Sequence, residues 1–297
     1  MNKQRQGYIF ILITVIFFST YETVSKTLVG TLATIQVSFW RFLIGGIFLA
    51  AILIVKGDWK ISYRDIFKVF LVGILNVVIS MNLLQYSLTF PGAKASAAAV
   101  IFSSNPIFVI IFSAFIEKIK PDKWKVFGLA LGLAGVVIIF IEKLNFSSLD
   151  LRSPLLALGS ACTYGLYTVL GRTTSIKIGS LKMNAYSFIL GSLFLLPFSL
   201  VTGSPIAANL SAASGRILYL GIFVTGIAYF SYFRGLSIVG AGSGSLVFFL
   251  KPILAAFIAV IVLKEAITLN LVIGTSFVIL GITVALYGSK IKSRLFE

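Results

Sequence analysis

The fold of this chain is decided by residues 240–281, which read GAGSGSLVFFLKPILAAFIAVIVLKEAITLNLVIGTSFVILG. Two apolar segments flank a short polar turn, and Lys251-Pro252 interrupts the first of them. A proline inside a helix leaves the carbonyl four residues earlier, here that of Phe248, without its amide partner and kinks the helix. A lysine facing lipid at this depth is costly. A freed carbonyl and a buried cation in one turn therefore indicate a polar cavity.

The same pattern occurs earlier in the chain. Each half carries a proline, a glycine 22 residues later and another after 7 more: Pro106, Gly128 and Gly135, then Pro252, Gly274 and Gly281. Each of these residues lies 146 positions from its counterpart, as residues 40–49 do from 186–195. Gly73 and Leu88 match Gly221 and Leu236 at an offset of 148. Several matches in one order indicate an internal duplication.

Composition places the chain in a membrane. Its 297 residues are 58% hydrophobic and 11% charged, which is too much apolar surface for a soluble domain of this size to bury. The net charge of +16 comes from short basic clusters between apolar runs, which is typical of cytoplasmic loops and does not indicate nucleic-acid binding. With no histidine and a single cysteine, Cys162, the sequence excludes a disulfide framework and a His/Cys metal site.

The apolar runs predict an all-α membrane protein with ten transmembrane helices, at about 20 residues for each crossing. The predicted spans lie near 8–24, 35–55, 67–88, 95–116, 126–141, 154–171, 183–202, 216–237, 244–263 and 271–288. Because each repeat has an odd number of spans, the second enters the membrane from the opposite side. Residues 1–146 and 147–297 are thus predicted to be two inverted five-helix repeats, joined by the loop at 142–153.

The distribution of positive charge predicts the orientation. With the N-terminus inside, sixteen of the 25 Lys and Arg residues fall in inner segments and six in outer segments. Positive residues accumulate on the cytoplasmic side of membrane proteins. We therefore expect both termini in the cytoplasm and the chain in the cytoplasmic membrane.

Two five-span repeats, each with a proline in its fourth span and glycines in its fifth, resemble the drug/metabolite transporter superfamily. The chain is most similar to the EamA family of bacterial inner-membrane exporters, and the turn Lys264-Glu265 after span nine supports the resemblance. It implies a secondary transporter in which spans 1, 3, 4, 6, 8 and 9 surround a central cavity. Members that resemble this chain move amino acids and their derivatives, nucleotide sugars or drugs.

Two charges inside the predicted spans are candidates for substrate binding. Glu22 is interpreted as a contact for a substrate amine or a protonatable coupling site. The alternatives are a fixed partner of Arg41 or Lys26, or a residue near the outer surface. Lys251 is interpreted as a cation for a substrate carboxylate, or as a lysine that snorkels to the cytoplasmic side. Arg41, some six residues into span two, is either a structural anchor or part of the cavity.

Four uncharged polar residues complete the candidate binding site. Asn82 in span three either lines the cavity or hydrogen-bonds between helices. Asn105 stands immediately before Pro106, as Lys251 stands before Pro252. Tyr164 in span six and Tyr229 in span eight are cavity candidates, with packing as the alternative. Gly128, Gly132 and Gly135 form a small-residue face and are assigned to close helix packing.

Three function classes fit a polytopic chain, and a secondary transporter fits best. The sequence has no nucleotide-binding Gly-x4-Gly-Lys-Ser/Thr loop, so a proton gradient or exchange must drive transport. It also lacks the motifs of intramembrane hydrolases, and no cofactor is expected. Isolated intramembrane charges of both signs favour export of amino acids or related metabolites. A drug or nucleotide-sugar transporter and a non-transporting receptor or scaffold remain alternatives, and a homodimer is possible.

Overall fold

The computed structural model describes residues 3–295, apart from residues 92, 94, 121, 141–150, 202, 204, 208 and 255–268. The described residues form helices and turns without a β-strand, which confirms the predicted all-α class. The first half contains α1 (Lys3–Phe18), α2 (Tyr21–Lys26), α3 (Thr34–Val55), α4 (Tyr63–Gly73), η1 (Ile74–Ser80), α5 (Met81–Ser87), α6 (Ala95–Phe102), α7 (Asn105–Ile116) and α8 (Lys123–Phe140). The second contains α9 (Arg152–Ile178), α10 (Ser180–Leu193), α11 (Leu196–Val201), α12 (Leu210–Tyr219), η2 (Leu220–Ile227), α13 (Ala228–Val239), α14 (Ala241–Ser245), η3 (Leu246–Phe249) and α16 (Leu269–Leu295).

Seven helical segments in the described part of the chain are long and apolar enough to cross a membrane. They are Lys3–Lys26, Thr34–Val55, Tyr63–Ser87, Ala98–Ile116, Arg152–Ile178, Ser180–Val201 and Leu210–Val239. They coincide with predicted spans one to four and six to eight. Span five falls on α8, and spans nine and ten fall on the shorter segments Ala241–Leu254 and Val272–Tyr287. A count of ten therefore stays a prediction, and the turn at 264–265 and most of the loop at 142–153 lie outside the described residues.

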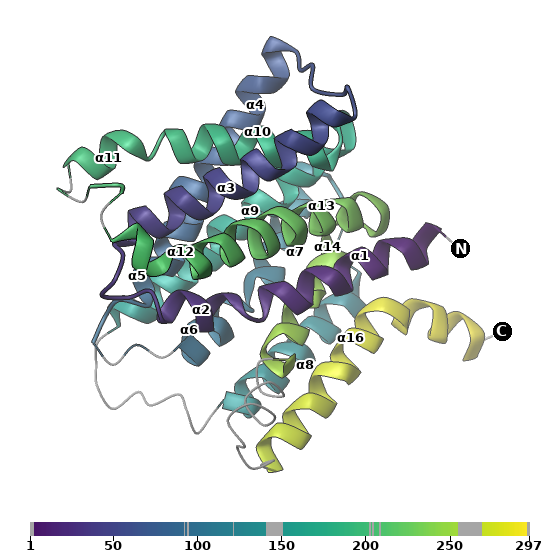
Figure 1. Cartoon of the computed structure of the whole chain (residues 1–297). Helices are drawn as coiled ribbons and strands as arrows, with labels where there is room; N and C mark the ends of the chain where they lie inside the picture. The colour runs from purple at the N-terminus through teal and green to yellow at the C-terminus, as the bar shows by residue number, and fades with distance from the viewer. Residues whose placement is uncertain are drawn as a thin grey trace.

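The helices of the two halves interleave and do not form separate bundles. The helix α1 packs on α13, α3 on α10, and α9 on α5 and α7. Figure 1 shows α3 and α10 side by side, with α9 and α13 below them. A single apolar cluster runs through both halves and includes the edge-to-face pair Phe42 and Phe188, whose ring centroids are 5.0 Å apart. The interior between the halves is therefore where a site shared by both would lie.

Glycines in each half allow close contact with the backbone of the other half. A Cβ added to Gly45 of α3 would lie 2.8 Å from the carbonyl oxygen of Gly221 in η2. A Cβ added to Gly191 of α10 would lie 2.9 Å from the carbonyl oxygen of Gly73 in α4. Gly191 and Gly221 are the counterparts of Gly45 and Gly73 in the sequence repeat. This reciprocal exchange is the contact pattern expected of two related halves.

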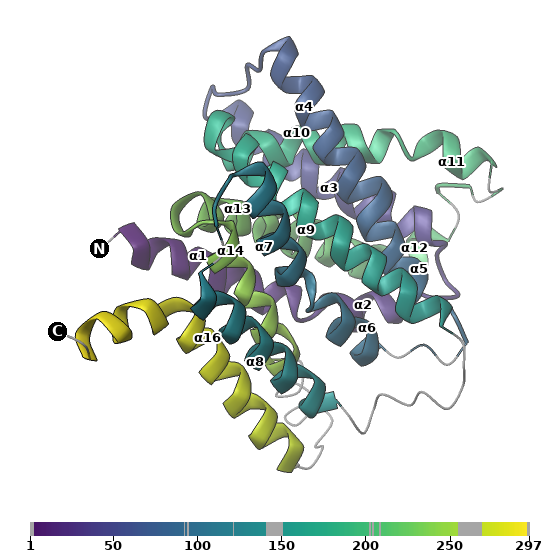
Figure 2. The ribbon, with the colours of Figure 1, turned by 180° about the vertical axis from the view of Figure 1, so that it is seen from behind.

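The glycines after each proline pack α8 against α16. A Cβ on Gly128 would lie 2.4 Å from the Gly281 carbonyl oxygen, and one on Gly135 would lie 2.6 Å from that of Gly274. A Cβ added to Gly132 would lie 2.8 Å from the ring of Phe249, so α8 also packs against η3. Figures 1 and 2 show the two helices side by side beside the rest of the molecule. The prediction that Gly128, Gly132 and Gly135 serve close helix packing is confirmed.

Several spans are broken near the middle of the molecule. Both π-helical segments, η1 and η2, occur at equivalent places in the two repeats. Span four is interrupted at Ser103 and Ser104, and Pro106 stands at the start of α7. The hydroxyls of these serines donate to the carbonyls of Ala99 and Ile101, both at 2.7 Å, and the backbone amides of Ser103 and Ser104 donate to the same two carbonyls. Such interruptions are tolerated in membranes where they face protein or a cavity.

The described ends of the chain lie on one side of the molecule. Figures 1 and 2 both show the start of α1 and the end of α16 on that side. A chain that starts and ends on one side of a membrane crosses it an even number of times. This arrangement is compatible with the predicted topology.

Candidate functional site

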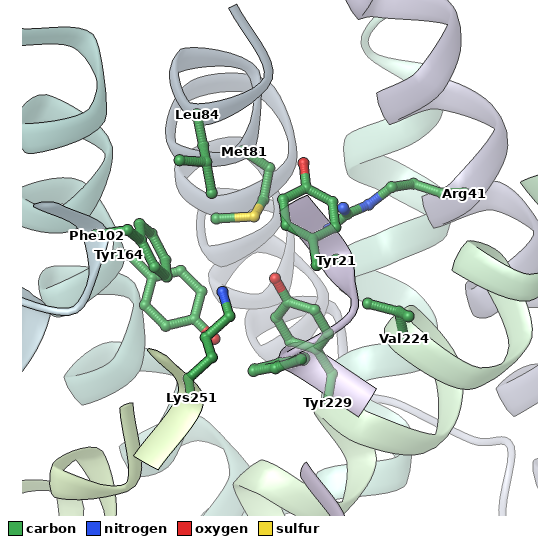
Figure 3. A pocket seen from close by; sticks show the side chains of 10 residues that line it. Tyr21, Arg41, Met81, Leu84, Phe102, Tyr164, Val224, Tyr229 and Lys251 are labelled. Atoms are coloured by element: carbon green, nitrogen blue, oxygen red, sulfur yellow. The ribbon is translucent and has the colours of Figure 1, made fainter. Parts of the chain in front are cut away.

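A small cavity lies between the halves, with a volume of about 20 Å³. This is room for about one water molecule. The first half contributes Phe18, Tyr21, Arg41, Met81, Leu84 and Phe102 to its lining. The second half contributes Tyr164, Val224, Tyr229 and Lys251. Figure 3 shows Lys251 and Arg41 approaching from different helices, with Tyr21 and Tyr229 nearby.

A buried ion pair between Lys251 and Glu22 borders this cavity. The Nζ of Lys251 donates to Oε1 of Glu22, and both residues are 3% exposed. Glu22 stands in the first turn of α2, directly after the break in span one, and Lys251 follows η3. Two broken spans from different halves thus bring the pair together. The alternatives in which Glu22 pairs with Arg41 or Lys26, or Lys251 snorkels to the surface, are wrong.

The pair is stabilising only while both partners are present. Each buried charge loses hydration worth several kcal/mol, and their mutual attraction offsets that loss. The ammonium also lies 5.1 Å from the centroid of the Phe102 ring and 5.9 Å from that of Tyr21. Breaking the pair would leave an uncompensated charge in the interior.

Arg41 is a second buried cation at the cavity, and it was not among the sequence-predicted binding residues. It is 1% exposed, and its Cζ lies 4.3 Å from the Tyr21 ring centroid and 4.4 Å from that of Phe42. Cation–π contacts contribute about 2 kcal/mol when desolvated, which is less than the several kcal/mol lost on burying the charge. Its Nε and Nη1 atoms have no hydrogen-bond partner.

Aromatic rings form much of the cavity wall. Tyr164 and Tyr229, both predicted candidates, line the cavity with ring centroids 6.3 Å apart. The ring centroids of Tyr164 and Phe102 are 5.1 Å apart, and those of Tyr229 and Phe18 are 4.8 Å apart. With 27 Phe and 11 Tyr residues in the chain, the sequence offered no means of selecting Phe18, Tyr21 or Phe102.

The two asparagine candidates lie at helix breaks and not in the cavity lining. The Nδ2 of Asn82 donates to the carbonyls of Val77 at 2.8 Å and Val78 at 3.1 Å, within the π-helical segment η1. The Nδ2 of Asn105 donates to the Phe102 carbonyl at 3.0 Å, at the break before Pro106. Irregular turns free carbonyl groups, and these amides satisfy them. A role for Asn82 or Asn105 in substrate binding stays a prediction.

Ion pairs hold the halves together at the end that the charge pattern assigns to the cytoplasm. Acids of the first half meet bases of the second in Glu117–Arg172, Asp65–Lys177 and Asp58–Lys182. Arg172 also donates from Nε to the Leu236 carbonyl at 2.8 Å, at the end of α13. These ion pairs therefore link the two halves at this end of the molecule.

A family model for EamA-like transporters matches the chain twice, over residues 5–141 and 151–287. The chain belongs to the EamA-like transporter family. A relative from Clostridium kluyveri, named an uncharacterized transporter, is 37% identical over 302 residues, which cover 98% of this chain and 96% of the relative. Another uncharacterized transporter, from Archaeoglobus fulgidus, is 29% identical and covers 93% of this chain and 96% of its own length.

The fold of this EamA-like transporter is also similar to a solved one. A protein crystal structure with 18% sequence identity superposes with a TM-score of 0.78 over 95% of this chain and 97% of the other. At that identity the likeness concerns the fold alone. Family membership and the apolar helices make the chain a multi-pass membrane transporter with a small-molecule substrate.

Proposed function

We propose that this EamA-like transporter exports amino acids or related metabolites across the cytoplasmic membrane by alternating access. The observation that supports this most directly is the buried pair of Glu22 and Lys251 beside a cavity between the halves. A zwitterion brings one charge of each sign and is therefore suited to exchange partners with such a pair. Opening of the broken spans on either side would expose the cavity alternately.

Counterflow in proteoliposomes tests transport without knowledge of the coupling ion. Vesicles containing the purified chain are loaded with one unlabelled amino acid, and entry of the same labelled compound is followed for all twenty. We expect accelerated entry for a subset of them. The double variant Glu22→Gln/Lys251→Met is the matched control, because it replaces the pair with uncharged side chains of similar size. Equal rates for the parent, this variant and empty vesicles would favour the receptor or scaffold alternative.

The proposed orientation of two inverted five-span repeats predicts which loops face outward. Cys162 is first replaced by alanine, which leaves no cysteine in the chain. Cysteine is then placed at Lys60, before α4, or at Thr89, after α5; both positions are exposed. A membrane-impermeant maleimide added to intact cells should label only Thr89→Cys, and Lys60→Cys should react after lysis. Labelling of both variants in sealed cells would overturn the topology.

A further inference from the structure

The guanidinium of Arg41 is a buried charge without an ionic partner. The ion pairs among the described residues use other cations, namely Arg172, Lys177, Lys182 and Lys251. Two of the three guanidinium nitrogens of Arg41, Nε and Nη1, have no hydrogen-bond partner at all. Buried polar groups in proteins are nearly always hydrogen-bonded, and buried charges are nearly always paired. Among the described side chains whose buried polar atoms lack a partner, Arg41 is the one cation, and it lines the cavity. Its position there indicates that a ligand supplies the missing acceptor.

The charges around the cavity leave one positive charge in excess. Lys251 and Glu22 neutralise each other through their direct contact. Apart from Arg41 and Lys251, the residues that line the cavity are uncharged. The group that Arg41 lacks is therefore a negatively charged acceptor, such as a carboxylate.

We propose, on the basis of the transport function proposed above, that Arg41 binds the carboxylate of the substrate and determines which compounds are accepted. A guanidinium is planar and donates two parallel hydrogen bonds to a carboxylate, which a lysine ammonium cannot do. The rings of Tyr21 and Phe42 lie 4.3 and 4.4 Å from its Cζ and fix its position. The bound carboxylate supplies acceptors for donors that are otherwise unsatisfied.

Arg41 and Lys251, the cation of the ion pair, lie near the same aromatic ring, that of Tyr21. Both Arg41 and Lys251 lie against this ring, with Cζ at 4.3 Å and Nζ at 5.9 Å from its centroid. Figure 3 shows the two cations on either side of Tyr21. A substrate whose carboxylate binds Arg41 would therefore direct its remaining groups towards Lys251 and Glu22. Arg41 selects for the carboxylate, whereas the ion pair responds to the rest of the molecule.

Ligand-induced thermal stabilisation tests this assignment separately from transport. The purified full chain is titrated with each of the twenty amino acids and with the α-amide of each, which keeps the amine but lacks the α-carboxylate. Ligands that bind the folded state raise the unfolding temperature. For the parent we expect stabilisation by a subset of the acids and little or none by their amides. In Arg41→Met the affinity for those acids should fall about 10- to 100-fold, the loss expected for a charged hydrogen-bonding partner.

Two further variants separate binding from folding. Arg41→Lys keeps the charge but not the planar group, so it should fold and bind the acids more weakly than the parent. Arg234→Met removes an exposed arginine of α13 by the same substitution and should leave the affinities unchanged. Should Arg41→Met misfold, the affinity of Arg41→Lys decides the question.

The outcomes distinguish this inference from the proposed transport function. Stabilisation of the parent by amides as strong as by acids, or unchanged acid affinities in both Arg41 variants, would overturn the role of Arg41. Counterflow of the same compounds would then still support transport. A parent that no compound stabilises and that shows no counterflow would overturn both proposals.

Discussion

Replacing Lys251 with methionine should abolish transport and lower the free energy of unfolding by roughly 3–5 kcal/mol, the cost of breaking a buried ion pair. The stability falls because Glu22, 3% exposed, loses its only ion-pair partner among the described residues. Transport fails because the cavity loses the cation that responds to substrate. Thermal unfolding in detergent and counterflow in proteoliposomes measure the two effects on one preparation. Lys251→Met with parental stability and flux would remove the pair from the mechanism.

A double variant that removes both charges separates the effect on stability from the effect on transport. Glu22→Gln combined with Lys251→Met should recover much of the lost stability, since neither charge is then buried alone. Transport should stay lost, because neither charge is available to the substrate. The pair of Lys182 and Asp58, 2.7 Å apart with Asp58 exposed, is the matched control. Lys182→Met should change stability by less than about 1 kcal/mol. A double variant that transports like the parent would restrict the pair to a structural role.

Replacing Gly281 with leucine should separate α16 from α8 and destabilise the folded chain. A Cβ at this position would lie 2.5 Å from the backbone nitrogen of Gly132 and 2.6 Å from the Gly128 carbonyl oxygen. Backbone atoms cannot rotate away as side chains can, so the helices must move apart. Overpacking costs typically about 1–3 kcal/mol, and contact with backbone places this variant at the upper end or beyond. Thermal unfolding and size-exclusion profiles measure the loss.

The expected damage extends to the cavity. Gly132 also packs on Phe249, which precedes Lys251 by two residues, so displacement of α8 should disturb the ion pair and reduce counterflow. Gly215→Leu in α12 is the control, because nothing lies within 4 Å of a Cβ added there. That variant should unfold at or slightly above the parental temperature, since leucine favours helix more than glycine does. Equal behaviour of Gly281→Leu and Gly215→Leu would contradict the packing argument.

Features that depend on local composition and spacing could be predicted from the sequence. The apolar runs indicated the all-α membrane class, and the proline and glycine spacing indicated a duplication. The spacing of Gly128, Gly132 and Gly135 predicted the small-residue face of α8 that packs against another helix. These predictions hold because a helix in lipid must satisfy its own backbone and present small residues wherever another helix approaches closely. The candidates Glu22, Tyr164, Tyr229 and Lys251 were chosen because polar groups inside spans are costly unless they serve a purpose.

The partners of those polar groups were decided only by the tertiary structure. From the sequence, Arg41 and Lys26 are the nearest candidates for an ion pair with Glu22. The observed ion-pair partner is Lys251, which is 229 positions away. Likewise the sequence placed Arg41 in a span without showing which way it faces. The carbonyls to which Asn82 and Asn105 donate also depend on where the helices break, which the sequence does not give.

Hydrophobicity, charge and repeat spacing are properties of the linear chain, and they are enough to identify a duplicated, basic, helical membrane protein. Which charges are neutralised and which is left without a partner depends on the folded arrangement. That outcome depends on how broken spans from two halves cross and on the direction of each side chain around its helix. Two cations and one acid meet at the cavity because α2, α3 and the segment after η3 converge there.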